Sequence, residues 1–356
     1  MYDTHKTSSR SKALNQARQN KADEFYTRLE DIERELQNYS NHFQNKTVFC
    51  NADNPFESNF VKYFIDNFNT LGLKRLIAIG YSPDWKPFAT LIGPDPDPAY
   101  KAVITHVPNN YTGTVTQLLR LPGNHLTTLK RNGDFRSPES TQALQEADIV
   151  VTNPPFSLFT EHFKQVMDHG KDIIVLGPLT ALTNQELVPY VVDGTIRAGV
   201  NSKGHLTFRV PHTYPDHTIG KDGHPESSPS TMWVTTLQHG HDRPYLPLTH
   251  SYYDNPNLYP TYDNYDAIEV SRAVNIPHDY SGVMGVPISF FRYYNPNQFD
   301  IIDVWRHGYL AEQLGISKTT AISNGTPRLT NGPVVAKKAL FSRLLIKNKH
   351  PTGGHP

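Results

Sequence analysis

The stretch that decides the fold reads DIVVTNPPF (148–156), a short apolar run that leads directly into two prolines. A short apolar run bounded by turn residues is typical of a strand that is buried on both faces. Residues 158–169 then predict a helix that stops at Gly170. A strand, a turn and a helix in this order place NPPF at the carboxyl edge of an α/β sheet, where such folds bind their ligands.

Apolar segments elsewhere in the chain continue this alternation. Strands are predicted at 47–50, 76–79 and 172–176, and helices at 60–68 and from Pro138 onward. A strand, helix, strand succession of this length is a βαβ unit. The sequence therefore predicts a parallel sheet with NPPF at one of its edges.

Two capping boxes and a proline-rich insertion add to this pattern. Thr27-Arg-Leu-Glu30 and Thr183-Asn-Gln-Glu186 each predict the start of a helix. Residues 82–132 are interrupted by prolines and predict an inserted hairpin region. Within it, short strands are expected at 100–107, 115–121 and 125–131.

Composition excludes several classes of protein. The 356 residues, 37% hydrophobic and 19% charged, suit a globular chain with one large domain and a second lobe. No apolar run approaches the roughly 18–20 residues that a membrane helix needs, and the N-terminus lacks the apolar core of a signal peptide. The single cysteine, Cys50, excludes an intramolecular disulfide and a cysteine-based zinc cluster. We expect a cytoplasmic protein that does not associate with membranes.

The formal net charge of +0 conceals two basic ends. Residues 1–21 carry five Lys or Arg and one acid, and residues 337–349 carry five Lys or Arg and no acid. Such ends are found both in solvated tails and in segments that contact DNA phosphates. Charge alone does not decide between these two interpretations.

The NPPF turn has a chemical meaning beyond its rigidity. An exocyclic amino group such as that of adenine is a poor nucleophile, because its lone pair is delocalised into the ring. The Asn153 side-chain oxygen and the Pro154 carbonyl can accept hydrogen bonds from it while a sulfonium methyl group lies in line. Pro154 and Pro155 stiffen the loop, and Phe156 can stack on the base, a contact worth about 1–3 kcal/mol. NPPF alone also fits an ordinary rigid turn, but its position after a buried strand favours a catalytic loop.

The chain resembles the EcoRI-type adenine-specific DNA methyltransferases over most of residues 21–349. The segments that carry the resemblance are DEFYT (23–27), FCNADNP (49–55), SNF (58–60), GDF (133–135), NPPFS (153–157), MWVTTL (232–237), MGVPI (284–288), YNPNQF (294–299) and FSRLLI (341–346). The resemblance implies an α/β fold: a Rossmann-like S-adenosylmethionine-dependent methyltransferase core with an inserted hairpin region and a C-terminal target-recognition region. The expected division is a flexible basic arm (1–21), a catalytic domain (22–245), a target-recognition region (246–349) and a tail (350–356).

The resemblance also implies an activity and a set of site residues. The enzyme would transfer a methyl group from S-adenosylmethionine to adenine N6, after this base has flipped out of duplex DNA at a specific sequence, and would need no metal. The implied cofactor-binding residues are Phe25, Tyr26, Thr27, Asn51, Asp53, Asn54, Pro55, Asp134, Phe135 and Asn153. Asp134 would face the adenine ring of the cofactor, with Phe135 beside it.

Two features depart from the broader methyltransferase pattern. The usual glycine-rich turn after the first strand is absent, and Gly80-Tyr81 stands where a ribose-binding acid often ends the second strand. Asp53 and Asp134 also fit ordinary turns or Asx caps. The pair Phe25 and Tyr26 also fits core packing below the first helix.

Partners and alternatives follow from the same interpretation. Lys337 and Lys338 are expected near the DNA backbone, and Asn295 and Gln298 are candidates for reading bases. We expect a monomer whose partner, a cognate restriction endonuclease, is functional and not physical. The alternatives are an RNA or protein-glutamine N-methyltransferase, and a catalytically idle DNA-binding relative.

Two groups resemble metal ligands but are expected to be solvated loops: HGHD (239–242) and the pair Asp95 and Asp97.

Overall fold

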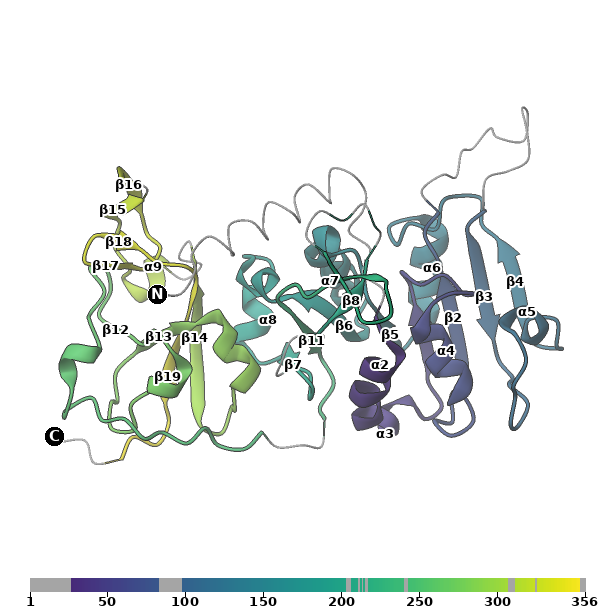
Figure 1. Cartoon of the computed structure of the whole chain (residues 1–356), viewed down its shortest axis with the longest axis horizontal. Coiled ribbons are helices and arrows are strands. Elements are labelled where there is room, and N and C mark those ends of the chain that lie inside the picture. Colours follow the sequence, from purple (N-terminus) through teal and green to yellow (C-terminus); the bar gives the residue numbers. More distant parts are fainter. Residues whose placement is uncertain are drawn as a thin grey trace. The chain divides into compact units, whose positions relative to one another are not determined.

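The structure is a computed structural model that describes residues 27–82, 98–202, 206–210, 212, 214, 217–239, 243–306, 311–323 and 325–352. The chain separates into two compact units (Figure 1), Met1–Pro178 with Gly199–Gly240 and Leu179–Ala198 with His241–Pro356. Residues 179–198, expected within the catalytic domain, thus cluster with the second unit.

The first unit contains the central sheet and its helices. Its helices are α2 (Leu29–Leu36), η1 (Gln37–Tyr39), α3 (Ser40–Phe43), α4 (Asn59–Asp66), α5 (Val115–Leu118), α6 (Pro138–Glu146), η3 (Phe156–Leu158) and α7 (Phe159–Asp168). Its strands are β1 (Thr47–Cys50), β2 (Arg75–Ile79), β3 (Tyr100–Ile104), β4 (His125–Thr128), β5 (Ile149–Thr152), β6 (Asp172–Pro178), β8 (Phe208–Arg209), β9 (Thr218–Ile219), β10 (Pro225–Ser227) and β11 (Thr231–Thr235).

Within the first unit the large sheet has the order β4-β3-β2-β1-β5-β6-β11. Strands β2, β1, β5 and β6 are parallel to one another. The β3–β4 hairpin continues the sheet in antiparallel fashion beyond β2, and β11 pairs antiparallel with β6. The α/β class with a Rossmann-like parallel core is confirmed, and so is a hairpin inserted after β2.

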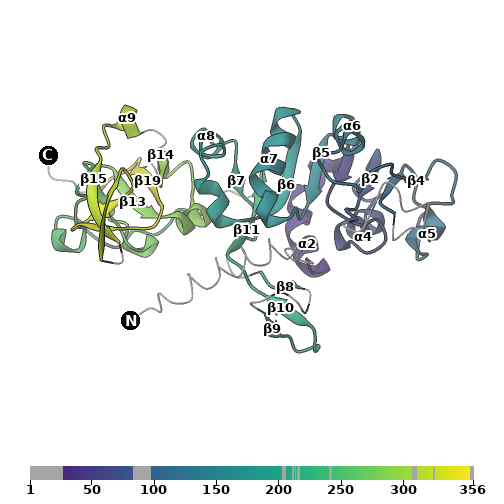
Figure 2. The ribbon, with the colours of Figure 1, turned by 90° about the horizontal axis from the view of Figure 1, so that it is seen from above.

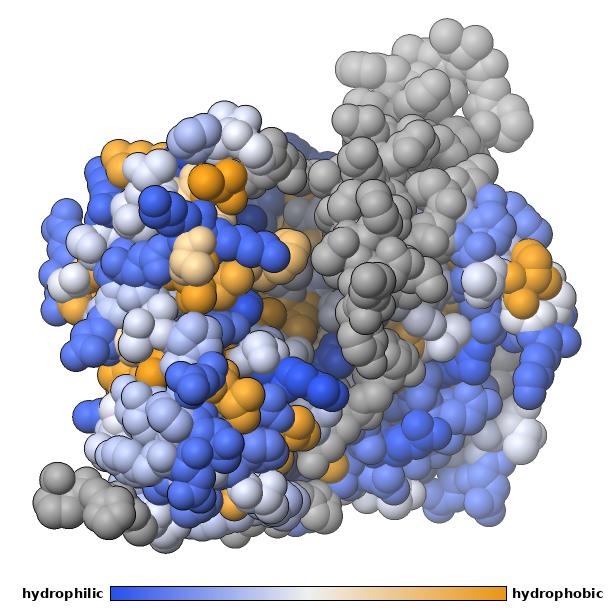
Figure 3. All heavy atoms as spheres, turned by 60° about the vertical axis from the view of Figure 1, so that its left-hand side comes forward, coloured by the Kyte–Doolittle hydropathy of each residue, from blue (hydrophilic) through white to orange (hydrophobic). Residues whose placement is uncertain are grey.

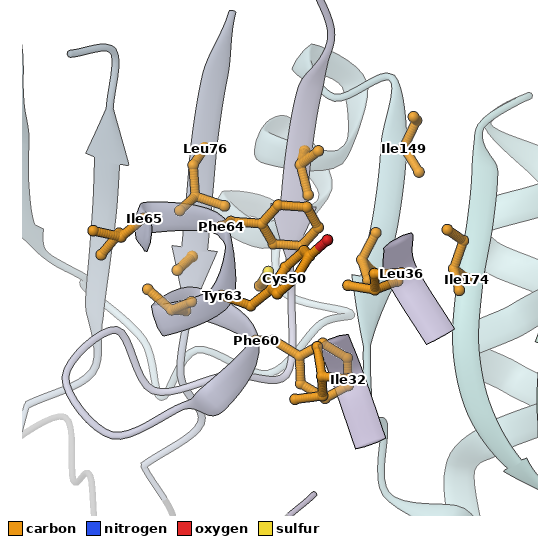
Figure 4. Close-up of a cluster of buried hydrophobic side chains, with 14 of the residues drawn as sticks. Ile32, Leu36, Cys50, Phe60, Tyr63, Phe64, Ile65, Leu76, Ile149 and Ile174 are labelled. Carbon is orange, nitrogen blue, oxygen red and sulfur yellow. The ribbon is translucent and has the colours of Figure 1, made fainter. Parts of the chain in front are cut away.

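Helices cover both faces of the parallel strands, with α2 and α4 on one face and α6 and α7 on the other (Figures 1 and 2). Alternate strand residues serve the two faces because successive side chains point in opposite directions. Figure 4 shows the α2 and α4 side, where Phe60 and Phe64 of α4 pack with Cys50, Leu76 and Ile149 of the strands. Every residue of β1 and β5 is buried, as expected for strands between two helical layers.

Two local predictions in the first unit are wrong. The segment at 115–121 is not a strand but contains α5, which begins at a capping box between Thr114 and Gln117. The box predicted at Thr27 does not form: α2 begins at Leu29, and Arg28 precedes it without a side-chain cap. The Thr27 hydroxyl has a different partner, which is described below with the site.

The second unit is built from short strands. Its helices are η4 (Leu179–Thr183), α8 (Val188–Val192), η5 (Pro256–Leu258), η6 (Ala273–Asn275), η7 (Ile288–Tyr293) and α9 (Ala311–Leu314). Its strands are β7 (Arg197–Ala198), β12 (Ile268–Glu269), β13 (Met284–Pro287), β14 (Phe299–Trp305), β15 (Thr319–Ser323), β16 (Thr326–Thr330), β17 (Val334–Val335), β18 (Lys338–Ala339) and β19 (Arg343–Asn348). The capping box predicted at Thr183 is wrong, since α8 begins only at Val188.

Two four-stranded sheets, β12-β13-β19-β14 and β16-β15-β18-β17, organise this unit. Tyr262, Trp305 and Leu345 lie in its core, and Arg343 forms a partly buried ion pair with Glu269 at 2.7 Å. The face of the molecule drawn in Figure 3 is mostly hydrophilic, with hydrophobic residues in small separate groups. Among the described residues, no helix is long and apolar enough to span a membrane.

Candidate active site

The order of the parallel strands determines where a ligand would bind. The chain runs from β1 to β2 on one side and later returns to β5 on the other side of β1. In α/β sheets the crevice at such a reversal, outside the carboxyl ends of the strands, is the usual ligand site. The loops that leave β1 and β5 at this point are residues 51–55 and 153–156.

Asp53 connects these two loops. Its carboxylate accepts a hydrogen bond from the Thr152 hydroxyl at 2.5 Å and another from the Ser58 hydroxyl at 2.6 Å. Ser58 is the N-cap of α4 and also accepts from the backbone N–H of Phe60. Burial raises the pKa of the Asp53 carboxyl to about 6, although both hydroxyl donors favour its ionised form. One carboxylate therefore fixes the end of β5 and the start of α4.

Asn153 begins the NPPF loop and is held from the N-terminal side of the chain. Its Nδ2 donates to the Thr27 hydroxyl at 3.2 Å. The carbonyl of Thr27 in turn accepts from Asn59 Nδ2 at 2.8 Å, at the first residue of α4. Thr27, predicted to cap a helix, instead joins Asn153, the first residue of the NPPF loop, to α4.

Phe156 is buried, with 5% of its surface exposed. Its ring makes an edge-on contact with Phe208 of β8, with 6.1 Å between the centroids. Figure 2 shows that β8, β10 and β9 form a small sheet that projects from the first unit. In this conformation Phe156 is therefore part of the hydrophobic core.

His162 of α7 is a site-adjacent residue that the sequence analysis missed. It is fully buried, and its Nε2 donates to the side-chain oxygen of Asn51 at 2.8 Å. The Phe135 ring lies edge-on to the imidazole at 5.2 Å. Burial lowers the pKa of His162 to about 3, so the ring is neutral, and its Nδ1 has no hydrogen-bond partner among the described residues. The sequence pattern that indicates a buried His162 is its position on the apolar face of a helix, beside Phe159 and other buried α7 residues.

Two glycines allow three loops to meet at the site. A Cβ on Gly80, directly after β2, would lie 2.7 Å from Asn54 Cα. A Cβ on Gly133 would lie 2.2 Å from the carbonyl oxygen of Gly80, and Gly133 has a φ of +75°. The loop after β1, the end of β2 and the GDF segment (133–135) are thus in close contact, although they are distant in the sequence.

The Asp134 carboxylate forms hydrogen bonds with Arg136. Its Oδ1 accepts from the backbone N–H and from Nε of Arg136, and its Oδ2 accepts from Nη2 at 2.6 Å. Burial opposes ionisation, but these hydrogen bonds and the charge of Arg136 outweigh it and lower the pKa of the Asp134 carboxyl. The guanidinium also lies over the Phe135 ring, 5.2 Å from its centroid.

The remaining predicted cofactor residues differ in exposure. Pro55 is buried, whereas Asn54 is exposed and its side-chain oxygen accepts from the Phe56 N–H at 3.0 Å. Phe25 and Tyr26 lie outside the described residues. The structure therefore brings Thr27, Asn51, Asp53, Asn54 and Asn153 together around the ends of β1 and β5. Asp134 and Phe135 approach from the GDF segment.

The four predicted DNA-binding residues all lie in the second unit and fall into two groups. Lys337 and Lys338 are exposed. Asn295 and Gln298 are buried residues, 3% and 5% exposed. Asn295 bonds to the Arg243 carbonyl and the Asn297 N–H. Gln298 forms bonds in both directions with the backbone of Leu246. Because these buried amides already hold the backbone, we withdraw both residues as candidates for reading bases.

No group of His, Cys, Asp or Glu suited to a metal ion occurs in the described part of the chain. His239 makes an edge-on contact with Tyr39, at 6.1 Å between ring centroids. Residues 240–242, and Asp95 with Asp97, lie outside the described residues.

The sequence matches a known family and several known proteins. A family model described as adenine-specific methyltransferase EcoRI matches residues 13–349. The chain is 38% identical over 345 residues to the Type II methyltransferase M.EcoRI of Escherichia coli, covering 95% of this chain and 97% of the relative. It is 33% identical over 348 residues to M.MgeORF184P of Mycoplasma genitalium (94% and 98% covered). It is 32% identical over 345 residues to M.MpnI of Mycoplasma pneumoniae (94% and 98% covered). No solved structure gives a significant match.

Proposed function

Because the chain belongs to the EcoRI family of adenine-specific methyltransferases, we propose that it methylates adenine N6 in duplex DNA, using S-adenosylmethionine. The observation that carries this proposal is the position of NPPF (153–156). The loop follows β5 at the strand reversal, inside the matched span of residues 13–349. Both the chemistry of the loop and its location suit transfer of a methyl group to a planar amino group.

We assign to Asn153 the binding of the adenine amino group that reacts. Its side-chain oxygen and the Pro154 carbonyl accept hydrogen bonds from the adenine N6 hydrogens and draw the nitrogen toward a tetrahedral geometry. The bond from Asn153 Nδ2 to the Thr27 hydroxyl fixes the position of the amide nitrogen, and we assign the amide oxygen to the base. Catalysis then rests on positioning and electrostatics, without a strongly basic group.

Phe156 remains the candidate for stacking on a flipped adenine. Its edge-on contact with Phe208 occupies part of the ring in the present conformation. A truncation to alanine would therefore remove core packing together with any stacking, and activity alone would not separate the two effects.

The groups around β1 and β5 fit S-adenosylmethionine by the chemistry of their donors and acceptors. A carboxylate offers about four acceptor positions, of which Arg136 uses three on Asp134. This leaves one for a donor such as an adenine amino group. Asn54 is exposed, and the buried Nδ1 of His162 is an acceptor without a partner among the described residues. Polar acceptors of this kind suit the amino and hydroxyl donors of a nucleoside and an amino acid.

When bound, the cofactor supplies an electrophilic methyl group on a sulfonium. We assign Thr27, Asn51, Asp53, Asn54 and Pro55 to the region that holds its amino-acid and ribose parts. Asp134 and Phe135 belong to the adenine side, and Asn153 lies between the cofactor and the target base. Phe25 and Tyr26 stay in this set on the resemblance alone.

The remaining proposals concern the DNA substrate, the oligomeric state and a partner enzyme. We propose that the protein acts on a specific DNA sequence as a monomer, with Lys337 and Lys338 near the phosphate backbone. The three relatives carry Type II names. This supports a role as the modification enzyme beside a cognate restriction endonuclease with which it shares a site but forms no complex.

One labelling experiment distinguishes the candidate activities. The purified protein is incubated in EDTA with S-adenosylmethionine tritiated on the methyl group, and with duplex DNA, single-stranded RNA or a glutamine-containing protein. We expect label as N6-methyladenine in the duplex alone. Label in RNA or in glutamine would transfer the assignment to those substrates, and no label in any substrate would favour an idle DNA-binding relative. Sedimentation of the same sample with and without DNA tests the monomer.

A further inference from the structure

One face of the small sheet β16-β15-β18-β17 carries exposed apolar side chains. Residues opposite one another on adjacent strands point to the same face. The register pairs Thr320 with Leu329, and Ile322 with both Pro327 and Lys338. Because Thr320 and Ile322 are two residues apart on β15, all five side chains lie on one face, which we call the ribbon face.

The ribbon face is unusual for an uncovered sheet surface. Leu329 is 68% exposed and Ile322 is 48% exposed, whereas Ala321, between Thr320 and Ile322, is buried. A sheet that packs one face on a core is expected to turn polar side chains toward solvent. Here three of the four outward positions on β15 and β16 are apolar, namely Ile322, Pro327 and Leu329. Folding of this unit gives no reason for that choice, so a binding partner is the better explanation.

The charge of the residues around the ribbon face indicates the chemical class of its partner. Residues 313–356 contain no Asp or Glu and seven Lys or Arg, namely Lys318, Arg328, Lys337, Lys338, Arg343, Lys347 and Lys349. Arg343 and Lys349 are neutralised by Glu269 and Asp300. Within the described part of the chain, Lys337 and Lys338 form no ion pair and are exposed. The apolar surface is therefore bordered by free positive charge, which suits a polyanion.

The turn that carries these lysines is held in place. Ala336 and Lys337 have φ values of +48° and +62°, a conformation that costs L residues energy. The Asp263 carboxylate accepts from both backbone N–H groups, at 2.9 and 2.7 Å. The acid thus stabilises the backbone of the turn and fixes the positions from which Lys337 and Lys338 project.

We propose that the ribbon face binds in a groove of the duplex DNA substrate. Ile322 and Leu329 contact base edges such as thymine methyl groups, and Lys337 and Lys338 contact phosphates. The major groove admits a two-stranded β-ribbon, and apolar contact with the thymine methyl is an established means of reading sequence. Self-association of two copies through this face is disfavoured, because a two-fold contact would bring the same lysines together. The inference rests on the proposed DNA substrate. It assigns base reading to Ile322 and Leu329 in place of Asn295 and Gln298.

The test uses the full chain and two duplexes. One contains the site that the wild-type protein methylates in the DNA of its expression host, and the other is a scrambled version. Affinities are measured by fluorescence anisotropy at several salt concentrations for wild type, Ile322→Ser, Leu329→Ser and Lys338→Gln. Leu258→Ser is the matched control, because Leu258 is a 62% exposed leucine of the same unit, in η5.

We expect Ile322→Ser and Leu329→Ser to lose at least about fivefold in preference for the methylated site, with the salt slope unchanged. Lys338→Gln should weaken both duplexes alike and flatten the slope of log K against log [salt] by about 0.9. Leu258→Ser should match wild type. Unchanged preference in both apolar variants would overturn the proposal, as would a wild-type dimer that Leu329→Ser dissociates. If wild type methylates no DNA, the proposed function itself fails, which is a separate outcome.

Discussion

The carboxylate of Asp53 accepts a hydrogen bond from the Thr152 hydroxyl, with 2.5 Å between Oδ2 and Oγ1. Thr152 is the last residue of β5 and directly precedes Asn153, whereas Asp53 follows β1. The bond thereby joins the turn proposed to hold the cofactor to the loop proposed to hold the base. One buried carboxyl group therefore bonds beside both proposed halves of the site.

Asp53→Asn should change how the free energy of unfolding depends on pH. Burial raises the folded-state pKa of Asp53 from 3.8 to about 6, so its contribution to stability is complete below pH 4 and is lost as the pH rises through 6. The asparagine variant lacks this loss. Its stability relative to wild type should therefore increase between pH 4 and 6, by up to about 1.4 kcal/mol per pH unit. Urea unfolding of both proteins across this range tests the prediction, and a difference independent of pH would contradict it.

Thr27→Val should slow methyl transfer more than it affects folding. The valine removes the hydroxyl that accepts from Asn153 Nδ2 but keeps the shape of the side chain. A hydrogen bond of this kind is worth about 1 kcal/mol, so single-turnover rates should fall roughly fivefold. Thr27→Ser, which keeps the hydroxyl, is the control and should remain near wild type. Equal rates in the two variants would remove Thr27 from the positioning of Asn153.

His162→Gln should have the opposite pH signature to Asp53→Asn. Burial depresses the folded-state pKa of His162 from 6.5 to about 3, so its contribution to stability is complete above pH 6.5 and is lost as the pH falls toward 3. Wild type should lose up to about 1.4 kcal/mol per pH unit relative to the glutamine variant over this window. Unfolding free energies at pH 7, 6, 5 and 4 provide the measurement. Parallel curves for the two proteins would show that His162 is not buried as a neutral ring.

Asp134→Ala should weaken binding of S-adenosylmethionine, measured by calorimetry in EDTA. The expected loss is about tenfold, since the residue would contribute a hydrogen bond from a charged group. Arg136→Ala is the companion variant. It leaves the carboxylate and its bond from the backbone N–H of residue 136 in place. It removes the two guanidinium bonds that orient the carboxylate, so a smaller loss is expected. If Asp134→Ala binds as tightly as wild type, the adenine-side role belongs to another residue.

Short-range signals in the sequence predicted the core of the fold. The run from Ile149 to Thr152 has the composition of a buried parallel strand, and Gly170 ends the helix that follows, with a φ of +64°. The strand expected at 115–121 was wrong although its correction was visible, because Thr114 and Gln117 have the spacing of a capping box. The sequence therefore carries a local signal for this helix.

Side-chain partners were harder to predict, because they come from distant parts of the chain. Thr27 has the spacing of a helix cap, but its hydroxyl bonds to Asn153, 126 positions away. His162 finds Asn51 at a separation of 111 residues. Asn295 and Gln298 resemble base-reading residues by type, yet both are buried and hold loop backbone. The identity of a polar residue does not reveal whether the fold or a ligand uses it.

The central claim is that Asn153 holds the reacting amino group, and Asn153→Ala tests it most directly. The measurement is the single-turnover transfer of a tritiated methyl group from S-adenosylmethionine to duplex DNA at saturating protein. We predict a loss of at least about 100-fold, as expected when an oriented hydrogen-bonding group is removed from the reacting centre. The unfolding free energy should stay close to wild type, and the variant should still bind S-adenosylmethionine. A variant that folds, binds S-adenosylmethionine and methylates adenine at a near-normal rate would contradict the account.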